Sequence, residues 1–163
     1  MKKSGLILAL FGLVTVAFAQ RGNQKWYLHA VGVSTGSAVY STFPVLGMSY
    51  DRFITNQNSL ELILSSDLVN STEITGYYKY IKSIPGVPAS VRWYCGVGIH
   101  ASKWNTTGTT GGPDGLLGIG YTFDQLPFNG TFDWRPSVNI GSDQTIYAFA
   151  PTRFALTARY IIE

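Results

Sequence analysis

The two histidines are the side chains in this sequence best suited to proton transfer, because imidazole titrates near neutral pH. Ser102 follows His100 by two residues, so in a strand the two side chains would share a face. A histidine beside a hydroxyl is a minimal arrangement for nucleophilic catalysis, and it would suit an enzyme that modifies lipid at the rim of a barrel. A His-x-Ser pair is common by chance, however. We therefore predict a hydrogen-bonded histidine and no catalytic residue.

A metal site is not indicated either. We expect His29 near the middle of its strand and His100 near the end of another, and no run of carboxylates or cysteines joins them. Cys95 is the only cysteine, which excludes an internal disulfide and reads as a small apolar side chain. The sequence predicts no cofactor.

The charged residues are more informative, because they alternate with apolar ones. In the stretch 132–136, Phe132 and Trp134 point one way in a strand, whereas Asp133 and Arg135 point the other. In a soluble sheet the aromatic face would pack against a core. No amphipathic helical period of useful length follows residue 20, so the sequence offers no element to cover that face.

Eight alternating stretches separated by turn clusters predict an all-β chain. They span residues 25–35, 43–53, 58–66, 72–82, 90–102, 113–124, 128–139 and 153–162. Most are longer than an ordinary strand of about five or six residues, and they approach the roughly ten residues that a tilted strand needs to cross a bilayer. Tight turns follow the second, fourth and sixth stretches, and longer loops occupy 35–42, 102–113 and 140–152. Short turns at one end and long loops at the other are typical of outer-membrane barrels.

Each stretch has one apolar face, and in most the opposite face is polar or glycine-rich. We expect the polar faces to line the interior of an eight-stranded antiparallel up-and-down transmembrane β-barrel, which is just wide enough to be filled by side chains. Buried charges need partners, and the acids and bases on these faces are nearly balanced. The predicted lumen network consists of Asp51, Glu61, Glu73, Lys79, Arg92, Asp133, Arg135 and Arg159.

Aromatic residues gather near the ends of the predicted strands, where amphipathic rings would meet the two membrane interfaces. The predicted girdles consist of Tyr50, Tyr80, Trp93, Tyr121, Phe123, Phe128 and Tyr160 at the short-turn end, and of Trp104 and Phe154 at the long-loop end. Trp104, Tyr147 and Phe149 are the predicted contacts of the long loops with a binding partner.

The N-terminus predicts export. Lys2 and Lys3 precede an apolar run, and Ala17-Phe18-Ala19 forms a small-residue cleavage site before Gln20. We therefore expect residues 1–19 to be a signal peptide and 20–163 to be one barrel domain. Removing the signal leaves ten basic against nine acidic residues, which gives no support for nucleic-acid binding.

The segments D-G-L-L-G-I-G-Y-T-F at 114–123, L-P-F-N at 126–129 and F-D-W-R-P-S-V-N at 132–139 resemble small outer-membrane barrels common in Bacteroidetes-type bacteria. That family belongs to the OmpA-like and OmpX-like eight-stranded barrels. One departure concerns the C-terminus: such barrels usually end on an aromatic residue, whereas here Tyr160 is the nearest one.

The resemblance implies a monomer in the outer membrane of a Gram-negative bacterium, with a structural role or an adhesion or binding role through its outer loops. Its expected partners are outer-membrane lipids and an extracellular ligand, not nucleic acid. Two alternatives remain open: a rim enzyme acting on lipid through His100, and a soluble lipocalin-like barrel with a ligand in its mouth. A pore is a weaker third idea, because eight strands leave no open channel.

Overall fold

The computed structural model describes residues 27–37, 44–69, 71–105, 108–141 and 146–162. Most of these residues lie in strands, because the described segments are rich in β-branched and aromatic side chains. The strands are β1 (His29–Gly36), β2 (Val45–Phe53), β3 (Asn58–Ser66), β4 (Ser71–Ser83), β5 (Val91–Trp104), β6 (Gly108–Thr122), β7 (Phe128–Trp134), β8 (Ser137–Gly141), β9 (Ile146–Ala150) and β10 (Phe154–Ile162).

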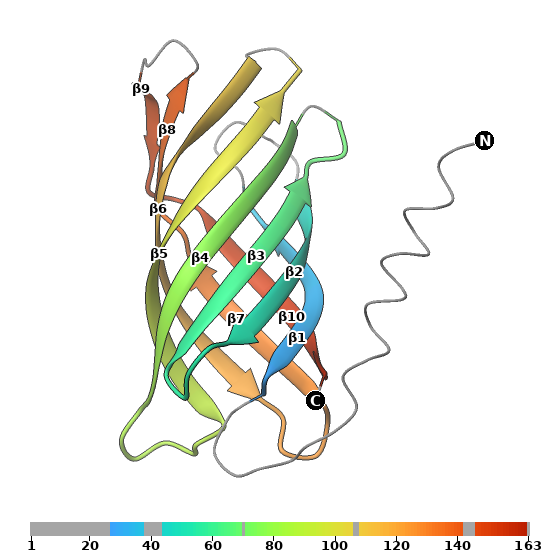
Figure 1. Ribbon diagram of the computed structural model, residues 1–163, viewed down its shortest axis with the longest axis vertical. Coiled ribbons are helices and arrows are strands. Elements are labelled where there is room, and N and C mark those ends of the chain that lie inside the picture. Colours follow the sequence, from blue (N-terminus) through green and yellow to red (C-terminus); the bar gives the residue numbers. More distant parts are fainter. Residues whose placement is uncertain (1–26, 38–43, 70, 106–107, 142–145, 163) are drawn as a thin grey trace, which may run out of the picture.

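The sheet closes on itself as an antiparallel barrel. Its order is β5-β4-β3-β2-β1-β10-β7-β6-β8-β9, and an additional pairing of β5 with β6 completes the ring. β7 and β8 both pair with β6, so they are two parts of one wall strand, and β9 and β10 are likewise parts of the next. These ten segments therefore make eight wall positions, which confirms the predicted eight-stranded barrel (Figure 1).

Proline accounts for the interruption between β7 and β8. Pro136 has no N–H to donate to the ladder, and Arg135 leaves the regular pairing with it. Two backbone bonds carry the wall across this gap: Arg135 N–H donates to the Arg153 carbonyl at 2.8 Å, and Gly115 N–H donates to the Pro136 carbonyl at 2.7 Å.

The predicted strand bounds hold best where the turns are tight. β3 has the bounds expected for it, whereas β6 begins at Gly108 and β9 lies inside the stretch predicted as a loop. The predicted loops 102–113 and 140–152 are therefore largely strand. The sequence predicts a loop for the glycine-rich stretch after residue 107, but there glycine allows close approach between strands. A Cβ at Gly112 would lie 1.9 Å from the Val138 carbonyl oxygen.

The barrel is inverted relative to a soluble one, with apolar side chains outside and charged ones inside. Ile99 is 73% exposed on the outer face, whereas Arg159 is 1% exposed in the lumen. The same alternation runs along β3 and β10. No helix in the described segments has the length and apolar character that a membrane-spanning helix needs.

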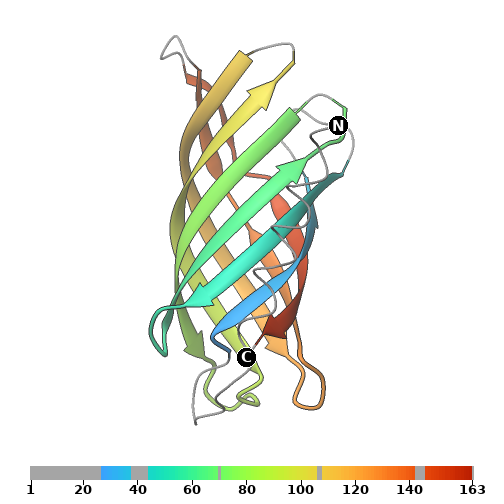
Figure 2. The same cartoon turned by 45° about the vertical axis from the view of Figure 1, so that its right-hand side comes forward.

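The two ends of the barrel differ in shape (Figures 1 and 2). One end, here called the short-turn end, carries the chain terminus after β10 and the turns 54–57, 84–90 and 123–127. The other, the hairpin end, carries the tips of β3–β4, β5–β6 and β8–β9. The β5–β6 and β8–β9 hairpins rise beyond the β3–β4 turn, so the wall is taller on one side.

Candidate functional site: the side chains that fill the barrel

An apolar cap closes the lumen at the short-turn end. Tyr27 lies just before β1, and its ring meets Phe53 edge to face, with centroids 4.8 Å apart. Ala30, Ile81 and Ile161 turn inward from three further strands and belong to the same buried cluster. These side chains belong to one buried apolar cluster, so the interior at this end of the barrel is filled by side chains.

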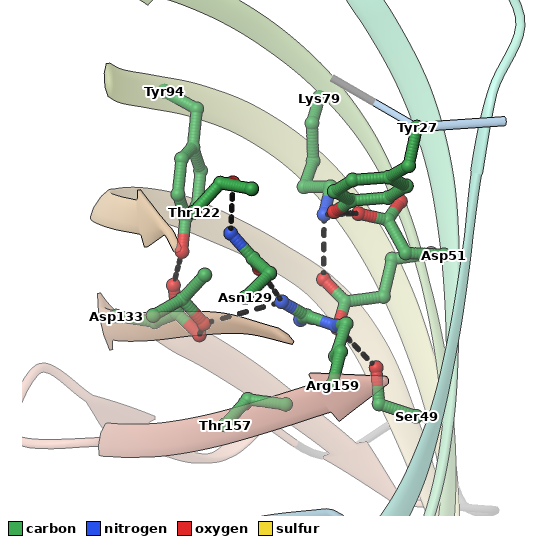
Figure 3. A network of polar contacts seen from close by, with 12 residues as sticks. Tyr27, Ser49, Asp51, Lys79, Tyr94, Thr122, Asn129, Asp133, Thr157 and Arg159 are labelled. Atoms are coloured by element: carbon green, nitrogen blue, oxygen red, sulfur yellow. Dashed lines mark hydrogen bonds and ion pairs between the residues drawn. The ribbon is translucent and has the colours of Figure 1, made fainter. Parts of the chain in front are cut away.

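A charged network adjoins the cap on its lumen side and centres on Glu61 of β3. Figure 3 shows Asp51, Lys79 and Arg159 of this network close to Tyr27. The Glu61 carboxylate pairs with Arg159 of β10 on one oxygen and with Lys79 of β4 on the other, the latter at 3.0 Å. Lys79 also pairs with Asp51 at 2.8 Å, and Asp51 accepts a hydrogen bond from the Tyr27 hydroxyl at 2.8 Å. All four charges are almost completely buried, so each depends on its partners for the solvation that it has lost.

Arg159 connects the network to the opposite wall. Its Nε donates to Ser49 Oγ at 2.9 Å, and one terminal nitrogen donates to Asn129 Oδ1 at 3.2 Å and to Thr131 Oγ1 at 3.3 Å. A planar guanidinium can direct several hydrogen bonds to fixed acceptors at once, whereas an ammonium is a point charge. Arginine at position 159 therefore ties β10 to β2, β3 and β7.

A second cluster lies beside Asp133 of β7. Asp133 pairs with Arg135 at 2.6 Å and accepts a hydrogen bond from the Tyr94 hydroxyl. The Arg135 guanidinium also lies over the ring of Tyr77, 5.7 Å from its centroid, and donates to Thr157 at 3.3 Å. Thus Asp133 and Arg135 point inward while Phe132 and Trp134 are exposed outside, as the alternation predicted.

Nearer the hairpin end, Glu73 of β4 pairs with Arg153 at 2.5 Å. Glu73 also accepts from Thr75 at 3.2 Å, and Arg153 donates to Ser137 at 3.1 Å. A cavity of about 30 Å³ remains beside this pair, which is room for only a few water molecules. The lumen is therefore packed with side chains at this level as well.

His100 lies in the lumen between three strands. Its Nδ1 is 2.8 Å from Asp114 Oδ1 on β6, and its Nε2 is 3.1 Å from Asn139 Oδ1 on β8. Ser102 instead shares a hydrogen bond with Thr110 at 2.8 Å. The imidazole side chain is fully buried, so His100 and Ser102 form neither a charge relay nor an accessible nucleophile.

His29 differs from the expectation of a mid-strand lumen residue. It opens β1 at the short-turn end, and its ring stacks on Tyr50 of the outer face with centroids 5.9 Å apart. Its Nδ1 is 2.7 Å from the Tyr50 hydroxyl. His29 and His100 therefore lie on opposite sides of the wall. The described residues contain no group of three histidine, cysteine, aspartate or glutamate side chains placed to hold a metal.

The eight predicted lumen charges have different places. Asp51, Glu61, Lys79 and Arg159 share the central network, Asp133 and Arg135 form a pair above it, and Glu73 pairs with Arg153. Arg92 lies half-buried at the start of β5, where its Nε donates to the Ala89 carbonyl at 3.4 Å. It belongs to the short-turn end of the lumen.

Sequence reasoning missed Asp114 and Arg153 as lumen charges. It also missed Tyr94 as a hydrogen-bond partner of Asp133 and Asn129 as a partner of Arg159. The signal for Asp114 was present, because its position in the strand has the same parity as inward-facing Leu116. Arg153 precedes β10 and lies outside any regular alternation. Its pairing with Glu73 becomes visible only once the chain between β9 and β10 is placed against the barrel wall.

The predicted aromatic residues of the short-turn end lie on the outer face. Tyr121 packs edge to face on Phe123 with centroids 4.9 Å apart, and Phe128 packs on Tyr160 at 5.5 Å. Tyr50 and Tyr80 are exposed there as well, and Trp93 is half-buried. At the other end Phe154 is exposed and stacks on Phe132 at 5.9 Å.

Trp104 is a correction to the predicted girdle. It shares its parity on β5 with His100 and Ser102, and its Nε1 donates to Ser102 Oγ at 3.3 Å. The ring is therefore tied to the lumen side and is not part of the outer aromatic belt. Among the predicted loop contacts, Phe149 lies exposed on β9, whereas the side chain of Tyr147 lies outside the described residues.

Comparison with known proteins tests the architecture. No family model matches the chain, and no curated protein sequence matches it. Among solved structures, the N-terminal β-barrel domain of Pseudomonas aeruginosa OprF superposes with a TM-score of 0.60. The chain has the OprF barrel fold. The match covers 81% of this chain and 95% of the OprF domain at 15% identity, so it shows that the two share the fold alone. It also confirms the fold expected from the OmpA-like resemblance.

Proposed function

We propose that this protein is an integral outer-membrane barrel of a Gram-negative cell envelope, exported by cleavage before Gln20. Its role is structural, and it binds at the cell surface through its tall hairpins. The observation that carries the proposal is the inversion of the wall, in which leucine, isoleucine and aromatic side chains are exposed while charges are buried. In lipid this distribution is the stable one, because the apolar side chains face hydrocarbon and the charges are kept from it. The closed barrel also leaves no unpaired backbone group facing hydrocarbon.

The same distribution argues against a soluble lipocalin-like barrel, in which the interior would be apolar and the exterior charged. An open pore is disfavoured by the cap around Tyr27 and Phe53 and by the network above it. A rim enzyme is disfavoured because His100 is fully buried and bonded on both ring nitrogens. A structural barrel with a surface-binding role fits these contacts best.

The membrane part of the proposal is tested by expressing the full chain in a Gram-negative host and fractionating the envelope. We expect the protein in the outer-membrane fraction, N-terminally trimmed to Gln20. It should migrate differently in cold and boiled SDS, because a closed barrel resists SDS until heated. Recovery in the soluble fraction without a mobility shift would instead favour the lipocalin-like alternative.

The binding part is tested with Phe149 of β9, an exposed aromatic side chain on the taller part of the wall. We expect Phe149→Ser to reduce attachment of expressing cells to a surface or to neighbouring cells. Val87→Ser is the matched control, because Val87 is an exposed apolar residue in the turn at the opposite end. Equal attachment by both variants and the parent would exclude this face as the binding surface.

A further inference from the structure

The β3–β4 turn presents two of the most exposed apolar side chains in the described part of the chain. Leu68 is 78% exposed and Val69 is 61% exposed. Leu68 has φ of 64°, which makes it the single non-glycine residue with positive φ among the described residues. This conformation is unfavourable for a side chain such as leucine, where glycine or asparagine would be easier. Leu68 is thus an apolar side chain at a position whose backbone conformation favours glycine or asparagine.

Side chains satisfy several backbone groups of the described part of this turn. Asp67 Oδ1 accepts from the N–H groups of Val69 at 3.1 Å and Ser71 at 2.7 Å. Ser66 Oγ accepts from Leu68 N–H at 3.0 Å and donates to the Ser71 carbonyl at 2.6 Å. From the neighbouring hairpin, Asn105 donates to the Val69 carbonyl at 3.2 Å. Internal satisfaction of backbone polar groups is what a turn needs where water is scarce.

Between positions 60 and 78, the described outer surface of this hairpin carries no charge. Leu60, Leu62 and Leu64 lead along β3 toward the turn, and Ile74 and Tyr78 lead away from it on β4. The charged residues described between positions 60 and 78 are Glu61, Asp67 and Glu73, and all three are directed into the barrel or buried. The Leu68–Val69 tip is therefore continuous with the face that the proposed function places in lipid.

The height of the turn fits the edge of the bilayer. Asn58 of β3 is paired with Tyr80, which marks the aromatic level at the short-turn end. Eight residue steps from Asn58 to Ser66 cover about 26 Å along the strand, or about 20 Å along the membrane normal at a tilt of about 40°. The apolar band of outer-membrane barrels is about 25 Å tall. The tip therefore lies near the upper boundary of that band, while the β5–β6 and β8–β9 hairpins rise higher (Figures 1 and 2).

We propose that the Leu68–Val69 tip is a lipid-anchoring surface that inserts into the outer leaflet at the boundary of its acyl chains, rather than a surface loop open to water. The anchor fixes the low side of the rim at the membrane surface, and the hairpins opposite it stand clear of the lipid. This inference rests on the membrane location in the proposed function. In this arrangement the strained backbone at Leu68 directs an apolar side chain toward lipid.

The test is a depth measurement by spin labelling, with the full barrel folded into vesicles of phosphatidylcholine and phosphatidylglycerol. Cys95→Ser removes the native thiol, and single labels are placed at Leu68→Cys or Val69→Cys. Leu64→Cys serves as the lipid-facing reference, and Val87→Cys, in the turn at the opposite end, serves as the second reference. Collision rates with oxygen, which concentrates in lipid, are compared with those of a water-soluble nickel chelate.

We expect the oxygen-to-nickel ratio at positions 68 and 69 to approach that at 64 and to exceed that at 87 several-fold. A ratio at 68 and 69 equal to that at 87, with the 64 label still in lipid, would overturn the anchor and leave the tip available to a protein partner. A water-like ratio at 64 itself would show that the proposed membrane location had failed. If the Leu68→Cys protein does not fold, the Val69→Cys label decides the question by the same comparison.

Discussion

The hydroxyl end of Tyr94 occupies the space that a side chain at Gly118 would need. A Cβ placed on Gly118 would lie 2.5 Å from the Tyr94 hydroxyl oxygen and equally close to Asp133 Oδ1. Gly98 stands in the same relation to Tyr77, whose ring would lie 2.4 Å from an added Cβ. At these two lumen positions, glycine therefore leaves the space that the tyrosine side chains occupy.

Replacing a glycine that packs against a lumen tyrosine should destabilise the barrel. We expect Gly118→Ala to lower the free energy of unfolding by about 1–3 kcal/mol, because Tyr94 must move and its bond to Asp133 is lost. Gly76→Ala is the matched control, since a Cβ there would meet no atom within 4 Å. It should be neutral or stabilising by about 0.4–1 kcal/mol. Urea unfolding in vesicles measures the free energy of unfolding of both variants. Equal values would show that Tyr94 does not need the space at position 118.

The central ion-pair network gives a second prediction. Arg159→Met leaves Glu61 with Lys79 as its remaining cation and removes the donor to Asn129. Breaking one partner out of a buried pair typically costs about 3–5 kcal/mol. Arg52→Met, which removes an exposed arginine from the outer face of β2 at the short-turn end, should change stability by no more than about 0.5 kcal/mol. Unfolding curves of the two variants in the same vesicles provide the comparison.

A double variant separates charge burial from loss of packing. In the double variant Glu61→Gln/Arg159→Met, no carboxylate is left without its arginine, and Lys79 keeps Asp51. The double variant should therefore be less destabilised than the sum of the two single variants. Strict additivity would mean that Arg159 acts mainly through its packing.

His100 gives a third prediction, because it bridges β5, β6 and β8. His100→Leu keeps most of the volume but removes the donor to Asp114 and the contact with Asn139. We expect a loss of about 1–3 kcal/mol from the unsatisfied buried carboxylate, together with faster amide exchange in β8. Ser102→Ala, two residues along the same face, should leave the exchange of β8 unchanged. Unchanged exchange in the leucine variant would remove His100 from the contacts that hold this hairpin.

The faces of the strands could be predicted from the sequence because each depends only on local alternation. Phe132, Asp133, Trp134 and Arg135 all lie on the expected sides, as does Glu61. Trp104 differs, because the sequence predicts it inside the loop 102–113, where alternation does not apply, whereas in β5 it shares the parity of His100 and Ser102. Alternation is therefore the reliable signal, and residue type alone misled where the two disagreed.

The partners of the buried charges could not be predicted, because pairing across a barrel depends on strand register and tilt. Arg153 and Glu73 are 80 residues apart, and Arg159 and Glu61 are 98 apart. Near-equal numbers of acids and bases predicted that pairs would form, but balance alone does not say which side chains meet. The extension of the β5–β6 hairpin could not be predicted for a different reason. Glycine and proline at 108–115 are typical of loops, although here they lie in β6.

The outer face of β3 gives the prediction that best separates a membrane barrel from a soluble one. Leu62 is 50% exposed near the middle of β3, so Leu62→Arg would be nearly neutral if that face met water. In a bilayer an arginine near the midplane costs about 2–4 kcal/mol, because its charge is placed in hydrocarbon. We expect a loss of this size in vesicles, measured by urea unfolding. Val87→Arg, in the turn 84–90, should differ from the parent by no more than about 0.5 kcal/mol. If both variants unfolded like the parent, the outer face of β3 would not be in contact with lipid.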